Sequence, residues 1–129
     1  MDLRKQNFWG VADVKTKEEL KPNYGPVYAA AVYPGLCKIF HNHGYALAVH
    51  GSVARDFDVI AIPWTESVSD PDRVLAEITS VFAIRVCGDP TEMRYGRMAY
   101  TLSIGHSECA CDLSFFPPLT NRKQDKEQA

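Results

Sequence analysis

The sequence lacks the features that would assign it at once to a membrane, secreted or nucleic-acid-binding class. Its apolar runs are far shorter than the roughly 20 residues that a membrane-spanning helix needs. The start, MDLRKQNFWG, has no apolar segment of the kind that a signal peptide carries. The formal net charge is only -2, so no overall attraction draws the chain toward nucleic acid or membrane surfaces. We therefore expect a cytoplasmic protein that binds any charged ligand at a local cluster.

Cysteine is also scarce. The sequence has four cysteines, at positions Cys37, Cys87, Cys109 and Cys111. Four in 129 residues are too few for a disulfide framework, and this favours a reducing compartment. With 46% hydrophobic residues, the chain can bury one core and is too short for two comfortable domains. The patterning then predicts three segments. They are a polar amino-terminal arm (1–25) with a short helix near TKEEL, one domain (26–118), and a charged, disordered tail (119–129).

Within the domain, apolar periodicity predicts helices and strands in the order helix, two strands, helix, two strands. The first helix is expected over about 26–43, with Gly44 as its left-handed cap. YALAVH (45–50) and DFDVIAI (56–62) are typical of strands buried on both faces. This order predicts an α+β fold: a mixed β-sheet of about four strands with helices packed on one face.

The second half of the domain carries the remaining two strands. A helix is expected from Pro71, after the capping residues Ser69 and Asp70. GRMAYTLSIGHSECACDLSFFPP then predicts a hairpin that turns near Gly105 and ends at the two prolines.

Two acids stand at the start of the second strand, where an apolar strand has no structural need of them. Because side chains alternate along a strand, Asp56 and Asp58 are expected on one face, about 6.6 Å apart at their Cα atoms. That spacing suits two carboxylates that share one hard cation such as magnesium. In ECACDLSFF, the same alternation sets Asp112 on the face opposite Cys111. If the two strands are neighbours, the three aspartates form one acidic cluster, which is unfavourable without a metal.

These residues carry a resemblance to a known superfamily. HGSV at the end of one strand, DFD opening the next, and a later CDLS strand resemble the nucleotidyltransferase superfamily of the DNA polymerase β type, over about residues 26–118. The resemblance implies that Gly51 and Ser52 hold a nucleoside triphosphate, and that Asp56 and Asp58 bind Mg²⁺ or Mn²⁺. It also implies that Asp112 completes the metal site or acts as base for the attacking hydroxyl.

More closely, the stretches GYALAVHGSVARDFDVIAIPW, GRMAYTLSIG and DLSFFP are similar to short proteins of phage and prophage genomes. That closer similarity implies no activity of its own. A phage-encoded protein would act in the cytoplasm of the host.

One departure from the superfamily pattern concerns the loop between Ser52 and Asp56. Typical members have a short helix there, whereas here only VAR intervenes. The helix amino terminus that helps to cradle the triphosphate is therefore missing, and Arg55 is expected to compensate unless nucleotide binding is weak or lost.

Several residues have an ordinary structural reading beside a functional one. His50 is favoured as a polar strand end over a catalytic base, and Trp64 as a core or rim aromatic over a base-stacking platform. Arg94 and Arg97 fit exposed strand ends better than phosphate ligands. Cys109 and Cys111 could hold zinc with His106 and His43, but core cysteines are favoured.

Three function classes remain open. The first is an enzyme that transfers a nucleoside monophosphate from a nucleoside triphosphate to a hydroxyl. The second is a catalytically inactive nucleotidyltransferase-like phage accessory protein that binds a nucleotide or a host protein. The third is a structural role in which the acids only solvate a strand end. The chain lacks the helical domain with which larger members hold the acceptor, so a partner or a homo-oligomer is expected to supply that surface.

Overall fold

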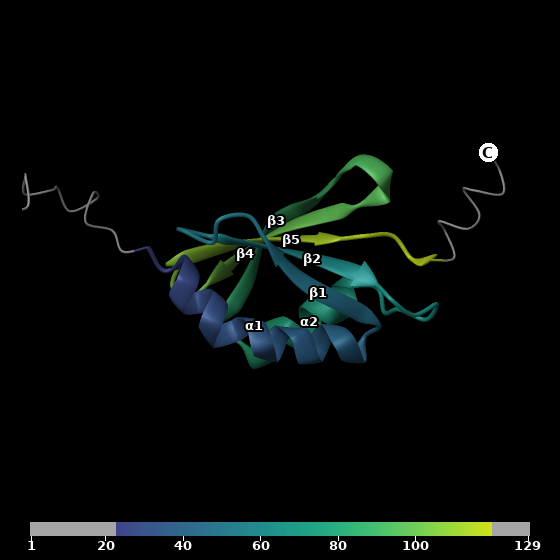
Figure 1. Cartoon of the computed structure of the whole chain (residues 1–129), viewed down its shortest axis with the longest axis horizontal. Helices are drawn as coiled ribbons and strands as arrows, with labels where there is room; N and C mark the ends of the chain where they lie inside the picture. The colour runs from purple at the N-terminus through teal and green to yellow at the C-terminus, as the bar shows by residue number, and fades with distance from the viewer. Residues whose placement is uncertain (1–22, 120–129) are drawn as a thin grey trace, which may run out of the picture.

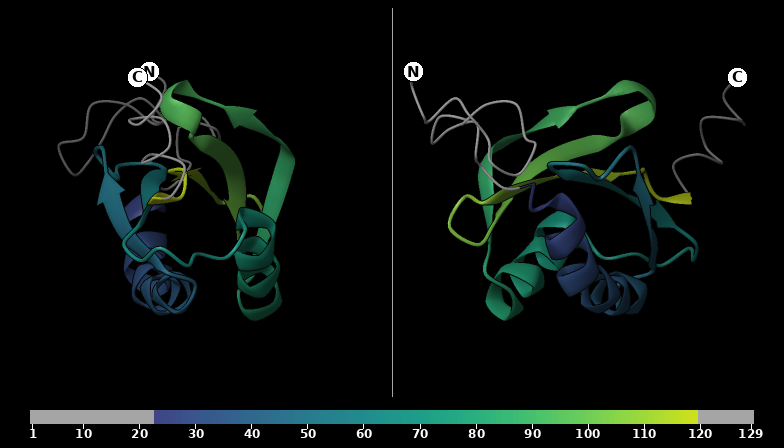
Figure 2. Two further views of the ribbon diagram at one scale, coloured as in Figure 1. Left: turned by 90° about the vertical axis from the view of Figure 1, so that its right-hand side faces the viewer. Right: turned by 60° about the vertical axis from the view of Figure 1, so that its left-hand side comes forward.

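The computed structural model describes residues 23–119, which form an α+β fold of two helices and a five-stranded sheet (Figure 1). The elements in chain order are α1 (Gly25–Asn42), β1 (Tyr45–His50), β2 (Phe57–Pro63), α2 (Pro71–Val81), β3 (Ile84–Glu92), the short 3-10 turn η1 (Arg94–Gly96), β4 (Met98–Ile104) and β5 (Cys109–Phe115). Both helices lie on one side of the sheet (Figures 1 and 2). Residues 1–22, with the helix expected at TKEEL, and the tail from residue 120 lie outside the described residues.

The sheet is mixed, with the strand order β1-β2-β5-β4-β3. β2 and β5 pair in parallel and the other neighbours are antiparallel. The expectation of about four strands was wrong by one, because β3 carries no apolar alternation. Only Ile84 of its nine residues is buried, and its pairing with β4 shifts register between Cys87 and Thr91. The far end of this hairpin rises away from the helices (Figure 2).

The two helices are held close to each other and to the sheet. In α1 the residues Val32, Leu36 and Phe40, four apart, are buried against the core. A Cβ at Gly35 would lie 2.7 Å from Cζ of Phe82, so glycine lets this ring pack closely where the segment after α2 meets α1, and a larger residue would displace the ring. α1 ends at Asn42, followed by Gly44 at φ +91°, as the sequence predicted.

The core fills the space between the helices and one face of the sheet. Phe115 lies near its centre, with ring centroids 5.7, 5.3 and 5.6 Å from those of Phe40, Tyr45 and Tyr100. β1 and β2 are not buried on both faces as expected, since both helices pack on the same side. In β2 the residues Phe57, Val59 and Ala61 face the helices, whereas Ile62 on the other face is 38% exposed.

Candidate active site on the acid face

The aspartates that the sequence singled out meet on the face of the sheet opposite the helices, which we call the acid face. Asp58 in β2 is the direct register partner of Asp112 in β5. The same row continues to His50 in β1, the partner of Asp58, and to Thr101 in β4, the partner of Asp112. Register partners in neighbouring strands present their side chains on the same face. The fold therefore aligns His50, Asp58, Asp112 and Thr101 across four strands.

The two carboxylates at the centre of this row repel each other. The pKa of Asp112 is raised, first by partial burial, then by the charge of Asp58 and by a side-chain hydrogen bond with Asp58. The charge of Asp56 adds a smaller increase, and the hydroxyl of Thr101, 3.5 Å from Asp112 Oδ1, opposes it. Asp112 therefore holds a proton more readily than an isolated aspartate would, and a divalent cation could take that proton's place.

Asp56 is near the pair but makes a structural contact of its own. The backbone N–H of Ala110 donates to Asp56 Oδ1 at 3.1 Å, at the point where the pairing of β2 and β5 begins. A carboxylate that accepts a backbone N–H is typical of a capping role. Asp58 and Asp112 therefore form a pair, and Asp56 lies at the same end of the sheet without completing the expected three-aspartate cluster in the described residues.

The loop after β1 passes close to Asp58. Gly51 has φ +80°, and a Cβ at this position would lie 3.1 Å from Asp58 Oδ2. Ser52 Oγ accepts a hydrogen bond from Ala54 N at 3.4 Å, and residues 51–56 contain bends and no helical turn. The backbone of this loop, rather than a helix terminus, is thus what the chain presents beside the acid pair.

Arg55, which we expected to compensate for the missing helix, is exposed at the end of this loop. Its carbonyl accepts a hydrogen bond from Cys109 Sγ at 3.7 Å, which ties the loop to β5. The backbone of Arg55 is therefore fixed to the sheet, while its side chain extends from the end of the loop.

Gly25 and Thr101 belong to this region and were not found from the sequence. A Cβ at Gly25 would lie 2.5 Å from the carbonyl oxygen of Val53 and 2.9 Å from the backbone of Arg55, so only glycine allows the first turn of α1 to rest against the loop. Nothing in the sequence marks Gly25. The position of Thr101 could have been predicted from the sequence. If residues are counted outward from the hairpin turn near Gly105, Thr101 falls on the strand opposite Asp112.

The other candidate residues lie away from the acid row. Trp64 follows β2 at the end remote from Asp58, is 58% exposed, and has its ring centroid 4.9 Å from that of His41. Arg97 lies over the ring of Phe116, with 5.5 Å between its Cζ and the ring centroid, and Arg94 begins η1. These positions fit the structural readings of the three residues.

A surface hollow of about 420 Å³ belongs to the helix layer. It is lined by residues of the carboxyl-terminal half of α1, namely Cys37, Lys38, His41 and Asn42. None of these residues is in the acid row, so the hollow is separate from the candidate site.

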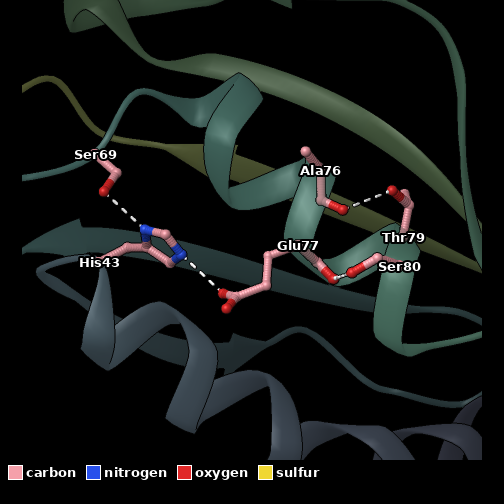
Figure 3. A network of polar contacts seen from close by, with 6 residues as sticks. All are labelled: His43, Ser69, Ala76, Glu77, Thr79 and Ser80. Carbon is pink, nitrogen blue, oxygen red and sulfur yellow. Dashed lines mark hydrogen bonds and ion pairs between the residues drawn. The ribbon is translucent and has the colours of Figure 1, made fainter.

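The cysteines and histidines considered for zinc are occupied otherwise. Cys109 and Cys111 are buried on the helix side of the sheet, where burial raises the pKa of both thiols and disfavours the thiolate that zinc binds. His43 lies between Ser69 and Glu77, 2.7 Å from Ser69 Oγ and 2.8 Å from Glu77 Oε2 (Figure 3). The positions of Cys109, Cys111 and His43 therefore give no support to a zinc site.

The carboxylate oxygens of Asp58 and Asp112 fit a magnesium site in which a substrate provides some of the ligands. Between residues 23 and 119, no group of three or more His, Cys, Asp or Glu side chains is gathered closely enough to hold a metal ion. Mg²⁺, however, is commonly bound by one or two carboxylates together with water and substrate phosphates. Asp58 and Asp112 could supply two such carboxylates, and a cation bound there would relieve their mutual repulsion.

Comparison with known proteins adds no assignment. No protein-family model matches the sequence, and no curated protein is similar to it. Neither of the helices in the described part of the chain is long and apolar enough to cross a membrane. The function must therefore be inferred from the geometry of the acid face.

Proposed function

We propose that the protein is a metal-dependent nucleotidyltransferase that transfers a nucleoside monophosphate from a nucleoside triphosphate to a hydroxyl acceptor. The observation that carries this proposal is the register pairing of Asp58 with Asp112 beside Gly51. Two carboxylates on adjoining strands, next to a glycine turn whose backbone a phosphate can approach closely, are what this chemistry needs. The motif resemblance of HGSV, DFD and CDLS supports the same reading.

In the proposed reaction, the acceptor oxygen forms a bond to the α-phosphorus and the bond to the pyrophosphate leaving group breaks. Asp58 and Asp112 would hold Mg²⁺ or Mn²⁺, and a cation held there would supply neutralisation of the charge that develops on the phosphate oxygens. Asp56 joins this set if its carboxylate turns from Ala110 N toward the pair. Asp112 is the acid nearest to β4, and it either completes the metal site or acts as the base that receives the proton of the attacking hydroxyl.

Gly51, Ser52 and Arg55 are proposed to bind the triphosphate. Gly51 lets a phosphate approach the backbone, and the Ser52 hydroxyl and following amides can donate to it. Because no helix follows Ser52, the charge of Arg55 carries a larger share of the affinity than in a site with a helix terminus.

A second candidate is a catalytically inactive nucleotidyltransferase-like phage accessory protein that binds a nucleotide or a host protein. The short loop favours it, as does the use of the Asp56 carboxylate by Ala110 N. In either case we propose a cytoplasmic protein, acting in the host cytoplasm if phage-encoded. We also propose that a partner protein or a second copy of the chain contributes to acceptor binding.

The test is a melting experiment followed by product detection. The full chain is melted with and without magnesium and each common nucleoside triphosphate, and conditions that stabilise it are incubated with candidate acceptors and examined by mass spectrometry. We expect stabilisation that requires both metal and nucleotide, and a product heavier by one nucleoside monophosphate. Stabilisation without turnover supports the inactive nucleotide-binding module. Indifference to metal and nucleotide refutes the enzyme and the nucleotide-binding module, and leaves the module that binds a host protein.

Arg55→Ala tests the loop independently of turnover. We expect at least several-fold weaker nucleotide binding, because a hydrogen bond to a charged group contributes about 1.5–3 kcal/mol. Arg73→Ala, an exposed arginine on α2, is the matched control. Equal affinity in Arg55→Ala and the control would remove Arg55 from the site.

A further inference from the structure

A second row of residues lies beside the acid row on the same face. Arg85 in β3 is the register partner of Ser103 in β4, which in turn pairs with Ala110 in β5. Leu102 and Ile104 are buried among the core residues, so the alternation of β4 directs Ser103 to the acid face. Arg85 and Ser103 are therefore on the face that carries Asp58 and Asp112.

Ser103 is a buried polar side chain that has no hydrogen-bond partner among residues 23–119. Its residue is 7% exposed, and its Oγ has no hydrogen-bond partner within the described chain. Leaving a buried hydroxyl unpaired is unfavourable, and such groups in folded proteins mark a missing partner. The hydroxyl can therefore donate to an oxygen from outside the described residues, such as that of a ligand.

Arg85 supplies a positive charge from the neighbouring strand, at the register position opposite Ser103. It is exposed, and its guanidinium donates to a neutral group, Ser107 Oγ, at 3.2 Å. A guanidinium held by one neutral hydroxyl keeps other donors for an anion and can turn toward it. A ligand oxygen that meets both Arg85 and Ser103 would be a phosphate or carboxylate oxygen.

The separation between this pair and the acids suits one ligand that reaches both. Ser103 is the diagonal neighbour of Asp112 across the β4–β5 pairing, since Thr101 is its direct partner. Diagonal neighbours are about 7–8 Å apart. Gly51 and Ser52 lie on the other side of the acid pair, beyond β2 at the end of β1. The two sides of the acid pair therefore offer two separate places for anionic groups.

We propose that Arg85 and Ser103 bind an anionic group of the acceptor, so that the acceptor is a hydroxyl compound that also carries a phosphate or carboxylate. This inference rests on the proposed nucleotidyltransferase function for the identity of the ligand. With its anion at Arg85 and Ser103, the acceptor lies over β4 and β5 and its hydroxyl reaches Asp112. The triphosphate then occupies the Gly51 side.

The experiment uses inorganic phosphate as the probe, titrated calorimetrically into the metal-free full chain. Arg85→Gln and Ser103→Ala are each expected to weaken phosphate binding about tenfold or more, whereas the control Arg73→Gln leaves it unchanged. Ser103→Ala should melt at or above the temperature of the parent, so its loss of phosphate binding would not reflect unfolding. The titration is then repeated with magnesium and a saturating nucleoside triphosphate, where the phosphate affinity should stay the same.

Three results would overturn the inference: no phosphate binding by the parent, binding that Arg85→Gln does not change, or displacement of phosphate by the nucleotide. The last would assign Arg85 and Ser103 to the nucleotide's own phosphates. The proposed function fails separately, through the absence of any metal and nucleotide binding. Phosphate binding that depends on Arg85 would survive that failure.

Discussion

Two polar regions of the molecule differ in how completely the chain satisfies them. Around His43, Nδ1 lies 2.7 Å from Ser69 Oγ and Nε2 lies 2.8 Å from Glu77 Oε2 (Figure 3). The backbone N–H of Ser69 also donates to the His43 carbonyl at 3.0 Å, and Tyr45 donates its hydroxyl to the Ser69 carbonyl at 2.9 Å. This His43 network joins the end of α1 to the start of α2, with every partner inside the chain.

The acid face shows the opposite condition. Asp58 and Asp112 are like charges in direct register, and Ser103 Oγ is buried without a partner among the described residues. Polar groups whose hydrogen bonds are made within the chain stabilise the fold. Polar groups without such partners, and charges that repel each other, are typical of ligand-binding sites. The comparison therefore separates a structural polar network from a candidate site without reference to any family.

The largest expected effect is the loss of the His43 network. His43→Ala removes both side-chain hydrogen bonds and leaves the partly buried Ser69 hydroxyl unpaired, so we expect about 2 kcal/mol of destabilisation. Urea unfolding of the variant and the parent measures it. His106→Ala, in the exposed β4–β5 turn, is the control and should stay within about 0.5 kcal/mol of the parent. A His43 variant as stable as this control would show that the network contributes nothing.

The next effect is the response of the acid pair to metal. Without magnesium, Asp58→Asn should be as stable as the parent or more stable, because it removes a repulsion. Magnesium at ten times its dissociation constant should stabilise the parent by about 1.4 kcal/mol, a shift of several degrees, and should not stabilise the variant. Melting both proteins with and without magnesium gives the comparison.

Asp89→Asn, on the exposed β3–β4 hairpin, is the matched control and should respond to magnesium as the parent does. One result would contradict the hypothesis of a metal site at Asp58 and Asp112. If Asp58→Asn is destabilised and the parent is indifferent to magnesium, then Asp58 has a structural role like that of Asp56 at Ala110 N.

The smallest effect is a pH dependence that arises from Asp112. Its pKa is raised in the folded protein, so above the pKa of the unfolded chain the folded state retains a proton that the unfolded state has released. Its contribution is thus most favourable at low pH and is lost as pH rises through the folded pKa. Because Asp112 is exposed, we expect only a few tenths of a kcal/mol.

The measurement is the difference in urea midpoint between Asp112→Asn and the parent, followed from about pH 3 to pH 7 without metal. The variant should gain on the parent as pH rises. A difference that stays constant, or that shrinks with rising pH, would mean that Asp112 is not held in a repulsive pair.

The alternation of side chains along the strands accounts for most of what the sequence could predict about the site. It set Phe57 and Val59 toward the core and Asp58 and Asp112 on the opposite face, and the register of β2 and β5 agrees with that expectation. Alternation is a local property, so a short stretch of sequence is enough to show it.

Features that depend on distant contacts could not be predicted in this way. β3 is a strand because it pairs with β4, although it buries only Ile84. The pairing of Asp58 with Asp112, rather than a neighbouring position, depends on a register that no local pattern specifies. The contact of Ala110 N with Asp56 and the unpaired hydroxyl of Ser103 depend on the same long-range pairing.

The central place of β5 has a consequence for how the protein folds. β5 is the last strand in the chain but lies in the middle of the sheet, between β2 and β4. Until it inserts, β2 and β4 each have an unpaired edge, and the contact between residues 58 and 112 closes a long loop that slows folding. The acid pair can form only at the end of this process, when the hydrogen-bond ladder between the two halves of the sheet is complete. A chain stalled before residue 109 would present two open strand edges and no candidate site, so it would be prone to aggregate and unable to bind metal at Asp58 and Asp112.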